Sequence, residues 1–281
     1  MDSNIIISNS SAYQKLVATL REGGPSQLHV VADFDKTLTM GTWKGEKRFS
    51  LIELIRKYRY LPEGYVTEAY GLSDTFRPWE NDLSLSLEER RSRMMEWWST
   101  HVKVMSKYGL SREIVEKIIR EQEMGPRAGL STFLDTLFVK QVPLLIFSAA
   151  VTDLIEGFLR KEKMFHSNMH VISNAFAYDA AGIVTGYQST IIHSLNKSEV
   201  AVKDTPYYSQ IVSRPNVILL GDGLGDAEMV DGLEHVCVLK IGFLNDNVEK
   251  NLDAYKQAYD VVILNDGKMD FVNELLNEIL S

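Results

Sequence analysis

The sequence predicts an α/β fold with a Rossmann-like, mostly parallel core sheet and a helical cap domain inserted after the first strand of that sheet. Short apolar runs rich in β-branched residues recur along the chain, and helical stretches separate most of them. Such alternation is typical of a parallel sheet that helices cover on both faces. One long stretch of charged amphipathic segments interrupts the alternation, and 281 residues exceed the usual span of one domain.

The core is expected to comprise residues 1–40 and 127–281. Before its first strand, Ser10 or Ser11 is expected to cap a helix that runs to about Arg21, and Gly23-Gly24-Pro25 ends that helix. The predicted strands are 28–32, 142–147, 170–173, 217–220, 236–241 and 261–264.

Residues 41–126 are expected to form the helical cap. Amphipathic patterns cover residues 87–108 and 111–123, and no run in this part of the chain predicts a strand. Met40-Gly41 and Gly125-Pro126 are expected hinges, so that a lid between them would cover a site at the sheet edge. Within residues 176–193, the turn Asp179-Ala-Ala-Gly182 predicts a β-hairpin.

Composition narrows the class of protein. A formal charge of -8 and a pI near 5.4 argue against a nucleic-acid polymer or an anionic membrane as the main partner. The single cysteine, Cys237, lies in an apolar run and is expected to be a buried small hydrophobe, so no disulfide forms within the chain. The run Asn4-Ile-Ile-Ile7 is too short for a signal peptide, and no segment is long enough to span a bilayer. A cytoplasmic protein is expected.

Acidic residues follow two of the predicted strands. Asp33 and Asp35 come directly after residues 28–32, and Asp222 and Asp226 follow residues 217–220 within a glycine-rich turn. A lone Asp-x-Asp is best explained as a strand-ending turn, but parallel strands deliver their carboxyl ends to one edge of a sheet. Three or four carboxylates gathered there repel one another unless a cation neutralises them. The predicted cation is Mg²⁺.

Two more polar residues also follow predicted strands. Ser148 ends an apolar run before a predicted helix, where its hydroxyl and the nearby amides could hold phosphate oxygens, although a plain helix cap would look the same. Lys197 follows the predicted hairpin. If buried, it would neutralise a carboxylate and a phosphate oxygen together, whereas at the start of a surface helix it would be solvated. Taken singly, both residues are better explained by these plain roles.

Together these residues resemble the four motifs of the haloacid dehalogenase superfamily, in the order Asp33-x-Asp35-x-Thr37, Ser148, Lys197 and Gly221-Asp222-x-x-x-Asp226. Further motifs resemble the cytosolic type III pyrimidine 5′-nucleotidases, and the resemblance covers nearly the whole chain from about residue 15. It is weak between residues 40 and 77. The motifs are Ile146-Phe-Ser-Ala149, Ser173-Asn174, Asn196-Lys197, Ile218-Leu-Leu-Gly-Asp222 and Leu239-Lys-Ile-Gly-Phe-Leu-Asn-Asp246.

The resemblance implies a role for each of these residues. Asp33 would be the nucleophile that forms an aspartyl-phosphate, and Asp35 would protonate the leaving nucleoside and then activate water. Asp33, Asp222 and the backbone carbonyl of Asp35 would bind Mg²⁺. Asp226 would orient the metal's water ligands or Lys197. Phosphate would be held by Thr37, Ser148, Ala149 and Lys197.

The resemblance also implies that the cap selects the substrate, through Glu80 and Trp98. The plain explanations are an exposed loop acid for Glu80 and core packing for one or both of Trp97 and Trp98. An indole favours a flat or cationic base, so 7-methylguanosine monophosphate is an expected substrate beside uridine and cytidine monophosphates. Ala150 and Gly223 stand where related enzymes commonly have Gly and Ser, and neither change removes a catalytic group.

The expected function is therefore a Mg²⁺-dependent 5′-nucleotidase, and transfer of the phosphoryl group to another nucleoside could accompany hydrolysis. A phosphoserine-phosphatase-like enzyme would carry the same Asp-Phe-Asp-Lys-Thr-Leu-Thr stretch. A non-enzymatic, Mg²⁺-dependent phospho-receiver module would also need strand-end acids, a hydroxyl and a lysine. Asp35 argues against such a module, because a second positioned carboxylate speeds loss of the phosphoryl group.

Overall fold

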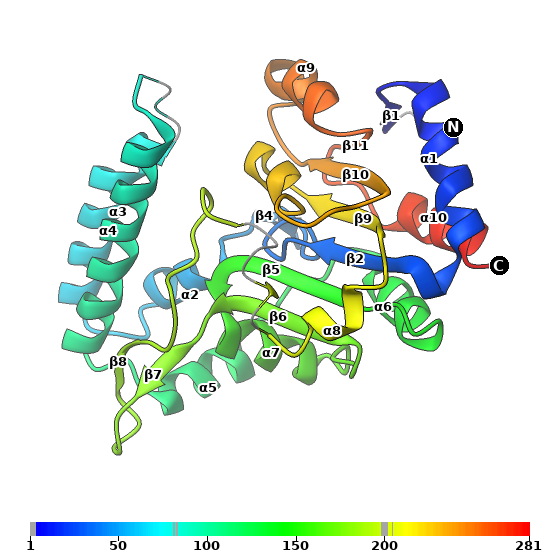
Figure 1. The fold of residues 1–281 in the computed structure, drawn as a ribbon. Coiled ribbons are helices and arrows are strands. Elements are labelled where there is room, and N and C mark those ends of the chain that lie inside the picture. The colour runs from blue at the N-terminus through cyan, green and yellow to red at the C-terminus, as the bar shows by residue number, and fades with distance from the viewer. Residues whose placement is uncertain (1–3, 81, 83, 198–201, 204) are drawn as a thin grey trace.

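A seven-stranded sheet forms the centre of the computed structural model, which describes residues 4–80, 82, 84–197, 202–203 and 205–281 (Figure 1). The strand order is β1-β11-β10-β9-β2-β5-β6, and every neighbouring pair is parallel except β1 with β11. This confirms the predicted fold class. The strands are β1 (Ile5–Ile7), β2 (Leu28–Ala32), β5 (Leu144–Val151), β6 (Met169–Asn174), β9 (Asn216–Gly221), β10 (Cys237–Leu244) and β11 (Val261–Leu264).

Helices cover both faces of the sheet, which explains why its central strands are apolar at consecutive positions. Val30 and Val31 are neighbours on β2 that point to opposite faces, and both are fully buried, each in a different hydrophobic cluster. One cluster includes side chains of α1 (Ser10–Gly23), α6 (Leu130–Val139), α7 (Thr152–Lys161) and α10 (Asp270–Ile279). The other includes side chains of α8 (Tyr208–Ile211) and α9 (Val248–Ala258).

The edge strand β1 was not predicted from the sequence. It has three residues and pairs antiparallel with β11, about 255 positions away, with Ile5 opposite Ile263. A run this short has no local signature of a strand, because its hydrogen bonds depend wholly on a distant partner. The cap of α1 is also one residue earlier than expected: the side chain of Asn9 accepts a hydrogen bond from the amide of Ala12.

Cys237 is a buried free cysteine, as expected, with 4% of its surface exposed. No helix among the described residues is both long and apolar enough to cross a bilayer.

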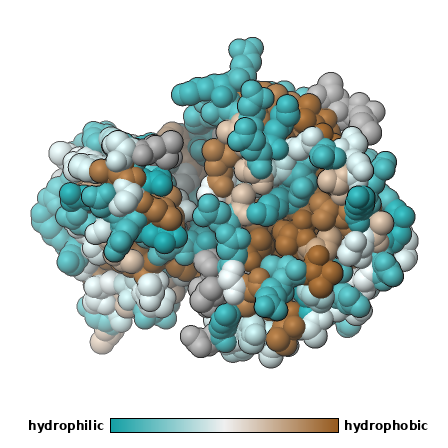
Figure 2. Space-filling view, turned by 45° about the horizontal axis from the view of Figure 1, so that its top comes forward, coloured by the Kyte–Doolittle hydropathy of each residue, from teal (hydrophilic) through white to brown (hydrophobic). Residues whose placement is uncertain are grey.

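The inserted residues form four helices within the described part of the chain: α2 (Leu51–Lys57), α3 (Glu63–Glu80), α4 (Leu87–Lys107) and α5 (Arg112–Glu121). The antiparallel pair α3 and α4 makes a lobe that projects from the core, and a space-filling view shows the two lobes meeting (Figures 1 and 2). Helix α5 instead packs on α7 of the core. The predicted hairpin is present as β7 (Phe176–Tyr178) and β8 (Val184–Tyr187), and β8 packs against α4.

The expectation of no strand in the insertion is wrong. A small hairpin pairs β3 (Thr42–Trp43) with β4 (Glu46–Lys47). Its two-residue turn, Lys44-Gly45, has positive φ at both positions, as tight hairpins require. Strands of two residues give no periodic pattern, and the dipeptide Lys-Gly is a weaker turn signal than Asn-Gly.

The two expected hinges lie side by side. Met40 donates its amide to the carbonyl of Gly125 at 2.9 Å, and Arg127 donates its amide to the carbonyl of Leu38 at 2.9 Å. The carboxylate of Asp266, in the turn after β11, accepts the amides of Gly41 and Thr42 at 2.8 and 2.7 Å. The chain therefore enters and leaves the inserted unit through one narrow connection.

The side chain of Arg127 fastens this connection to the core. Its guanidinium is fully buried, pairs with Asp266 at 3.3 Å and lies 4.1 Å above the ring of Phe243. It donates to the carbonyls of Thr37 and Thr39 at 2.6 and 3.1 Å. It also donates to the carbonyls of Lys36 and Gly267 and to the side chain of Asn245.

Arg127→Met is expected to lower the free energy of unfolding by about 3 kcal/mol, because it leaves buried carbonyls and a carboxylate without their donor. Arg160→Met is the matched control. Arg160 also lies over an aromatic ring, that of Phe165 at 4.0 Å, but its side chain is 59% exposed and its ion pair with Glu156 is on the surface. Its loss is expected to cost less than about 1 kcal/mol. Urea unfolding of both variants tests this, and equal losses would contradict it.

Candidate active site

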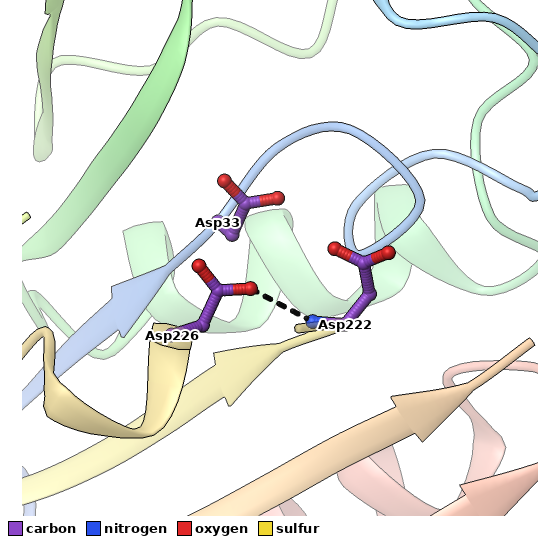
Figure 3. A group of neighbouring side chains, drawn as sticks. All are labelled: Asp33, Asp222 and Asp226. Carbon is purple, nitrogen blue, oxygen red and sulfur yellow. Dashed lines mark hydrogen bonds between the residues drawn. The ribbon is translucent and has the colours of Figure 1, made fainter. Parts of the chain in front are cut away.

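Three carboxylates converge at the carboxyl edge of the sheet. Asp33 follows β2, Asp222 follows β9, and Asp226 lies on the short 3₁₀ helix Leu224–Glu228. One oxygen of each lies within 4.8 Å of the others (Figure 3). Gly221 permits this approach, because a Cβ added there would lie 2.5 Å from the Cβ of Asp226. The predicted convergence of acids from two distant strands is therefore confirmed.

Lys197 is buried at the centre of this group. Its ammonium donates to Asp33 at 2.5 Å and to Asp226 at 2.9 Å, and 8% of the residue is exposed. It is not the solvated surface lysine of the plain explanation, and the helix that it might have started falls outside the described residues. The other oxygen of Asp226 accepts the amides of Asp222 and Gly223 at 3.2 and 2.9 Å. Asp226 thus holds Lys197 while its own carboxylate is fixed by the backbone.

Burial dominates the electrostatics of the cluster. It raises the pKa of Asp33 to about 6, although Lys197 acts in the opposite direction. Burial, together with the charges of Asp226 and Asp33, raises the pKa of Asp222 well above its ordinary value. The pKa of Lys197 is raised too, because the attraction of Asp226 and Asp33 outweighs the effect of burial. One ammonium faces three carboxylates, so the cluster favours additional positive charge.

Asp35 lines the same cavity but is not one of the three clustered carboxylates. Its carboxylate accepts the amide of Leu51, the first residue of α2, at 3.2 and 3.3 Å. Burial and the neighbouring charge of Asp33 raise its pKa to about 7. A carboxyl group with this pKa can both give and take a proton near neutral pH.

Ser148 lies in an irregular stretch of β5 rather than at a helix start. The register between β5 and β6 shifts between Phe147 and Val151, and Val151 is the N-cap of α7. The expectation that Ser148 directly precedes a helix is therefore wrong, and so is the helix-cap explanation. A local bulge of this kind re-aims backbone and side-chain groups at a strand end. The hydroxyl of Ser148 accepts the amide of Ala150 at 3.1 Å.

These residues line a cavity of about 380 Å³ between the core and the inserted helices. Nine of the ten residues predicted for the site lie on its wall: Asp33, Asp35, Glu80, Trp98, Ser148, Ala149, Lys197, Asp222 and Asp226. The tenth, Thr37, is fully buried and is not among the lining residues. Its carbonyl binds Arg127, and no described residue pairs with its hydroxyl.

A second cavity, of about 180 Å³, adjoins the first within the cap. The two share Ser50, Ile52, Glu80, Trp98, Ala149 and Ser194. Glu80 is the last residue of α3 and is half-buried, so it is not an exposed loop acid. Trp98 lies 6.5 Å from the ring of Tyr187, whereas Trp97 stacks on Phe76 at 6.3 Å. The adjacent tryptophans thus have different neighbours, and Trp98 borders both cavities.

A larger cavity, of about 630 Å³, lies between β1 and α10 and contains none of the predicted site residues. Its walls include Ile5, Tyr13 and Phe271. The carboxylate cluster is not part of its lining, so cavity size alone does not locate the chemistry here.

Several residues that support the site were not predicted from the sequence. The side-chain amide of Asn174 donates to the carbonyls of Ala149 and Ile192 at 2.9 and 2.8 Å, which joins the irregular stretch of β5 to the loop before Lys197. The hydroxyls of Tyr255 and Tyr259 donate to the carbonyls of Asp222 and Gly223. The motif Ser173-Asn174 was a signal for the first of these contacts, but no pattern marked the tyrosines, which come from α9 and the residue after it.

Comparison with known proteins gives consistent matches. A family model described as pyrimidine 5′-nucleotidase (UMPH-1) matches residues 36–280. The 7-methylguanosine phosphate-specific 5′-nucleotidase of Homo sapiens is 34% identical over 281 residues, covering 100% of this chain and 94% of that protein. The protein of the same name in Drosophila melanogaster is 32% identical over 260 residues, covering 92% and 81%.

Solved structures agree with these relatives. The crystal structure of cytosolic 5′-nucleotidase IIIB bound to cytidine has a TM-score of 0.89 and 28% identity, covering 99% of this chain and 94% of that one. A phosphoserine phosphatase in its apo form has a TM-score of 0.54 and 15% identity, covering 88% and 98%. The second match shows a shared fold alone.

The raised pKa of Asp35 gives a test of stability against pH. The folded protein keeps a proton on Asp35 that the unfolded chain has lost. This stabilising contribution is complete below the unfolded value of 3.8 and is lost as the pH rises through about 7. Asp35→Asn is therefore expected to raise the thermal midpoint in EDTA at pH 8 by on the order of 4 °C, and by less at pH 5.

The control is Asp253→Asn, because the side chain of Asp253 is 93% exposed. Its difference from the wild type is expected to be the same at both pH values. If the thermal midpoint of Asp35→Asn stays below that of the wild type at pH 8, ionisation of Asp35 does not destabilise the folded protein.

Proposed function

We propose that this chain acts on nucleoside 5′-monophosphates with a pyrimidine or 7-methylguanine base. The chain belongs to the pyrimidine 5′-nucleotidase (UMPH-1) family and is a phosphoric monoester hydrolase of the 5′-nucleotidase class. The observation that carries the proposal is a single cavity with two kinds of wall. Asp33, Lys197 and Asp222 line it from the core, and Glu80 and Trp98 line it from the inserted helices α3 and α4. The core residues suit a phosphate, and the residues of the inserted helices suit a flat base with polar edges.

The residues of the chain account for both chemical steps. Asp33 attacks phosphorus and forms an aspartyl-phosphate, while the P–O5′ bond breaks and Asp35 gives its proton to the departing O5′. Asp35 then takes a proton from water, the water oxygen attacks phosphorus, and the Asp33–phosphorus bond breaks to release phosphate. The raised pKa of Asp35 suits it to both transfers.

Phosphate binding falls to Lys197, Ser148 and Ala149. Lys197 is fixed by Asp226, so its ammonium stays in place as negative charge develops on the phosphoryl oxygens. Thr37 is proposed to support the phosphate-binding residues without lining the cavity, because its side chain is buried and its carbonyl is bound by Arg127.

The donor set of the cluster fits Mg²⁺. Carboxylate and carbonyl oxygens are the ligands that this hard cation prefers, and three carboxylates compensated by one ammonium favour a dication. Asp33, Asp222 and the carbonyl of Asp35 are the proposed ligands. When bound, Mg²⁺ supplies electrostatic stabilisation of the transferring phosphoryl group. Asp226 is proposed to support the site through Lys197 instead, since both of its oxygens accept hydrogen bonds within the chain.

Residues 41–126 are proposed to act as the cap that selects the base, and the structural match named as cytosolic supports a cytosolic place of action. The adjoining cavity beside Trp98 favours a nucleotide over phosphoserine, because a small amino acid would leave it empty. A receiver module is disfavoured, because the acid–base role proposed for Asp35 would speed dephosphorylation.

Phosphate release in Mg²⁺ is expected to be faster, by kcat/KM, for cytidine, uridine or 7-methylguanosine monophosphate than for phosphoserine. Asp33→Asn is expected to lower kcat by at least about a thousandfold, since the nucleophile is lost. Asp253→Asn, on the exposed face of α9, is the control and is expected to keep wild-type turnover. Faster release from phosphoserine than from every nucleotide would overturn the proposal.

Trp98→Tyr is expected to lower kcat/KM for 7-methylguanosine monophosphate about three- to tenfold more than for cytidine monophosphate, because the larger indole face attracts a cationic base more strongly. Trp97→Tyr is the neighbouring comparison, and its effect is expected to be smaller because Trp97 stacks on Phe76. Equal losses on both nucleotides would show that Trp98 contributes packing without selecting charge.

A further inference from the structure

We propose that Ser194 is a specificity-determining residue, which positions the carboxylate of Glu80 against the nucleobase. The inference rests on the proposed function. The hydroxyl of Ser194 donates to Oε1 of Glu80 at 2.5 Å across the junction of core and cap. The two residues are 114 positions apart in the chain, and both border the catalytic cavity and the adjoining cap cavity.

Ser194 occupies only one of the two acceptor oxygens of Glu80. A carboxylate accepts hydrogen bonds but cannot donate them, and no described residue donates to Oε2 of Glu80. The backbone of Glu80 is held separately, since its carbonyl accepts a hydrogen bond from Arg90 at 3.3 Å. The direction of the carboxylate therefore depends on Ser194. The remaining oxygen can accept an N–H of a base, such as the exocyclic amine of cytosine or guanine.

The loop that carries Ser194 is itself fixed, so that the hydroxyl has a defined position. The side chain of Asn174 binds both the amide and the carbonyl of Ile192 at 2.8 Å. The side chain of Asn196 accepts the amide of His193 at 2.8 Å. On the cap side, Arg91 of α4 donates to the carbonyl of Leu195 at 2.6 Å. Two cap helices thus contact adjacent residues of this loop.

A simpler role for Ser194 would be to hold the loop that ends in Lys197, three residues later. The two roles differ in their dependence on substrate. Lys197 contacts the phosphoryl group, so its displacement would slow hydrolysis of every phosphate monoester. Glu80 would contact only the base, so its misplacement would slow hydrolysis of nucleotides alone.

The test compares cytidine and 7-methylguanosine monophosphates with p-nitrophenyl phosphate, which has no base, in the presence of Mg²⁺. Ser194→Ala is expected to lower kcat/KM for both nucleotides about tenfold, mainly through KM, and to leave p-nitrophenyl phosphate unchanged. Ser194→Thr keeps the hydroxyl and is expected to retain most of the nucleotide activity. In a Glu80→Gln background, Ser194→Ala is expected to add little further loss, because coupled residues are not additive.

Ser131→Ala is the matched control. Ser131 also donates its hydroxyl to a carboxylate, that of Asp135 at 3.2 Å, but it lies on the exposed face of α6. It is expected to leave all three activities unchanged. Equal losses on all three substrates, or no loss on the nucleotides, would overturn the role of Ser194. A wild-type enzyme that shows no preference for nucleotides over p-nitrophenyl phosphate would instead refute the proposed function, and the inference with it.

Discussion

The compensation of buried negative charge is the constraint on which the rest of this structure depends. Asp33, Asp222 and Asp226 bring their carboxylates together at a buried sheet edge, and Lys197 is the ammonium that pairs with two of them. Like charges at this separation cannot all ionise without further positive charge. The parallel sheet brings these charges together, because it delivers both strand ends to one edge. The same geometry forms the cavity that we propose to bind phosphate and Mg²⁺.

Support for this cluster comes from buried polar residues that bind the backbone of the loops around the cavity. Arg127 binds the carbonyls of the loop after Asp35, and Asn174 joins Ala149 to the loop before Lys197. Tyr255 and Tyr259 hold the turn that contains Asp222. Each of these loops is thus held through its backbone, in addition to the hydrogen bonds that Asp33, Asp35 and Asp226 accept through their own carboxylates. Support from both sources fixes the positions of the acidic groups.

The amino-acid sequence predicted the features that depend on local pattern. The six parallel strands, the helical insertion and the hairpin with its Asp179–Gly182 turn all have strong periodic or turn signals. Because parallel strands end at the same edge of a sheet, the positions of Asp33 and Asp222 after their strands predicted that the two residues meet. The features it missed depend on distant partners. Strand β1 needs β11, the bulge at Ser148 needs β6, and Arg127 is an ordinary charged residue until the fold buries it. The contact between Glu80 and Ser194 likewise exists only after the cap meets the core.

Calorimetric titration of the enzyme with Mg²⁺, in buffers of different ionisation enthalpy, tests the charge constraint most directly. Raised pKa values at Asp33, Asp35 and Asp222 mean that the metal-free protein holds protons which a dication would displace. Saturable binding is expected, with a net release of protons at pH 6 that becomes smaller as the pH approaches 8. Saturable binding without proton release at pH 6, or no binding at all, would contradict it.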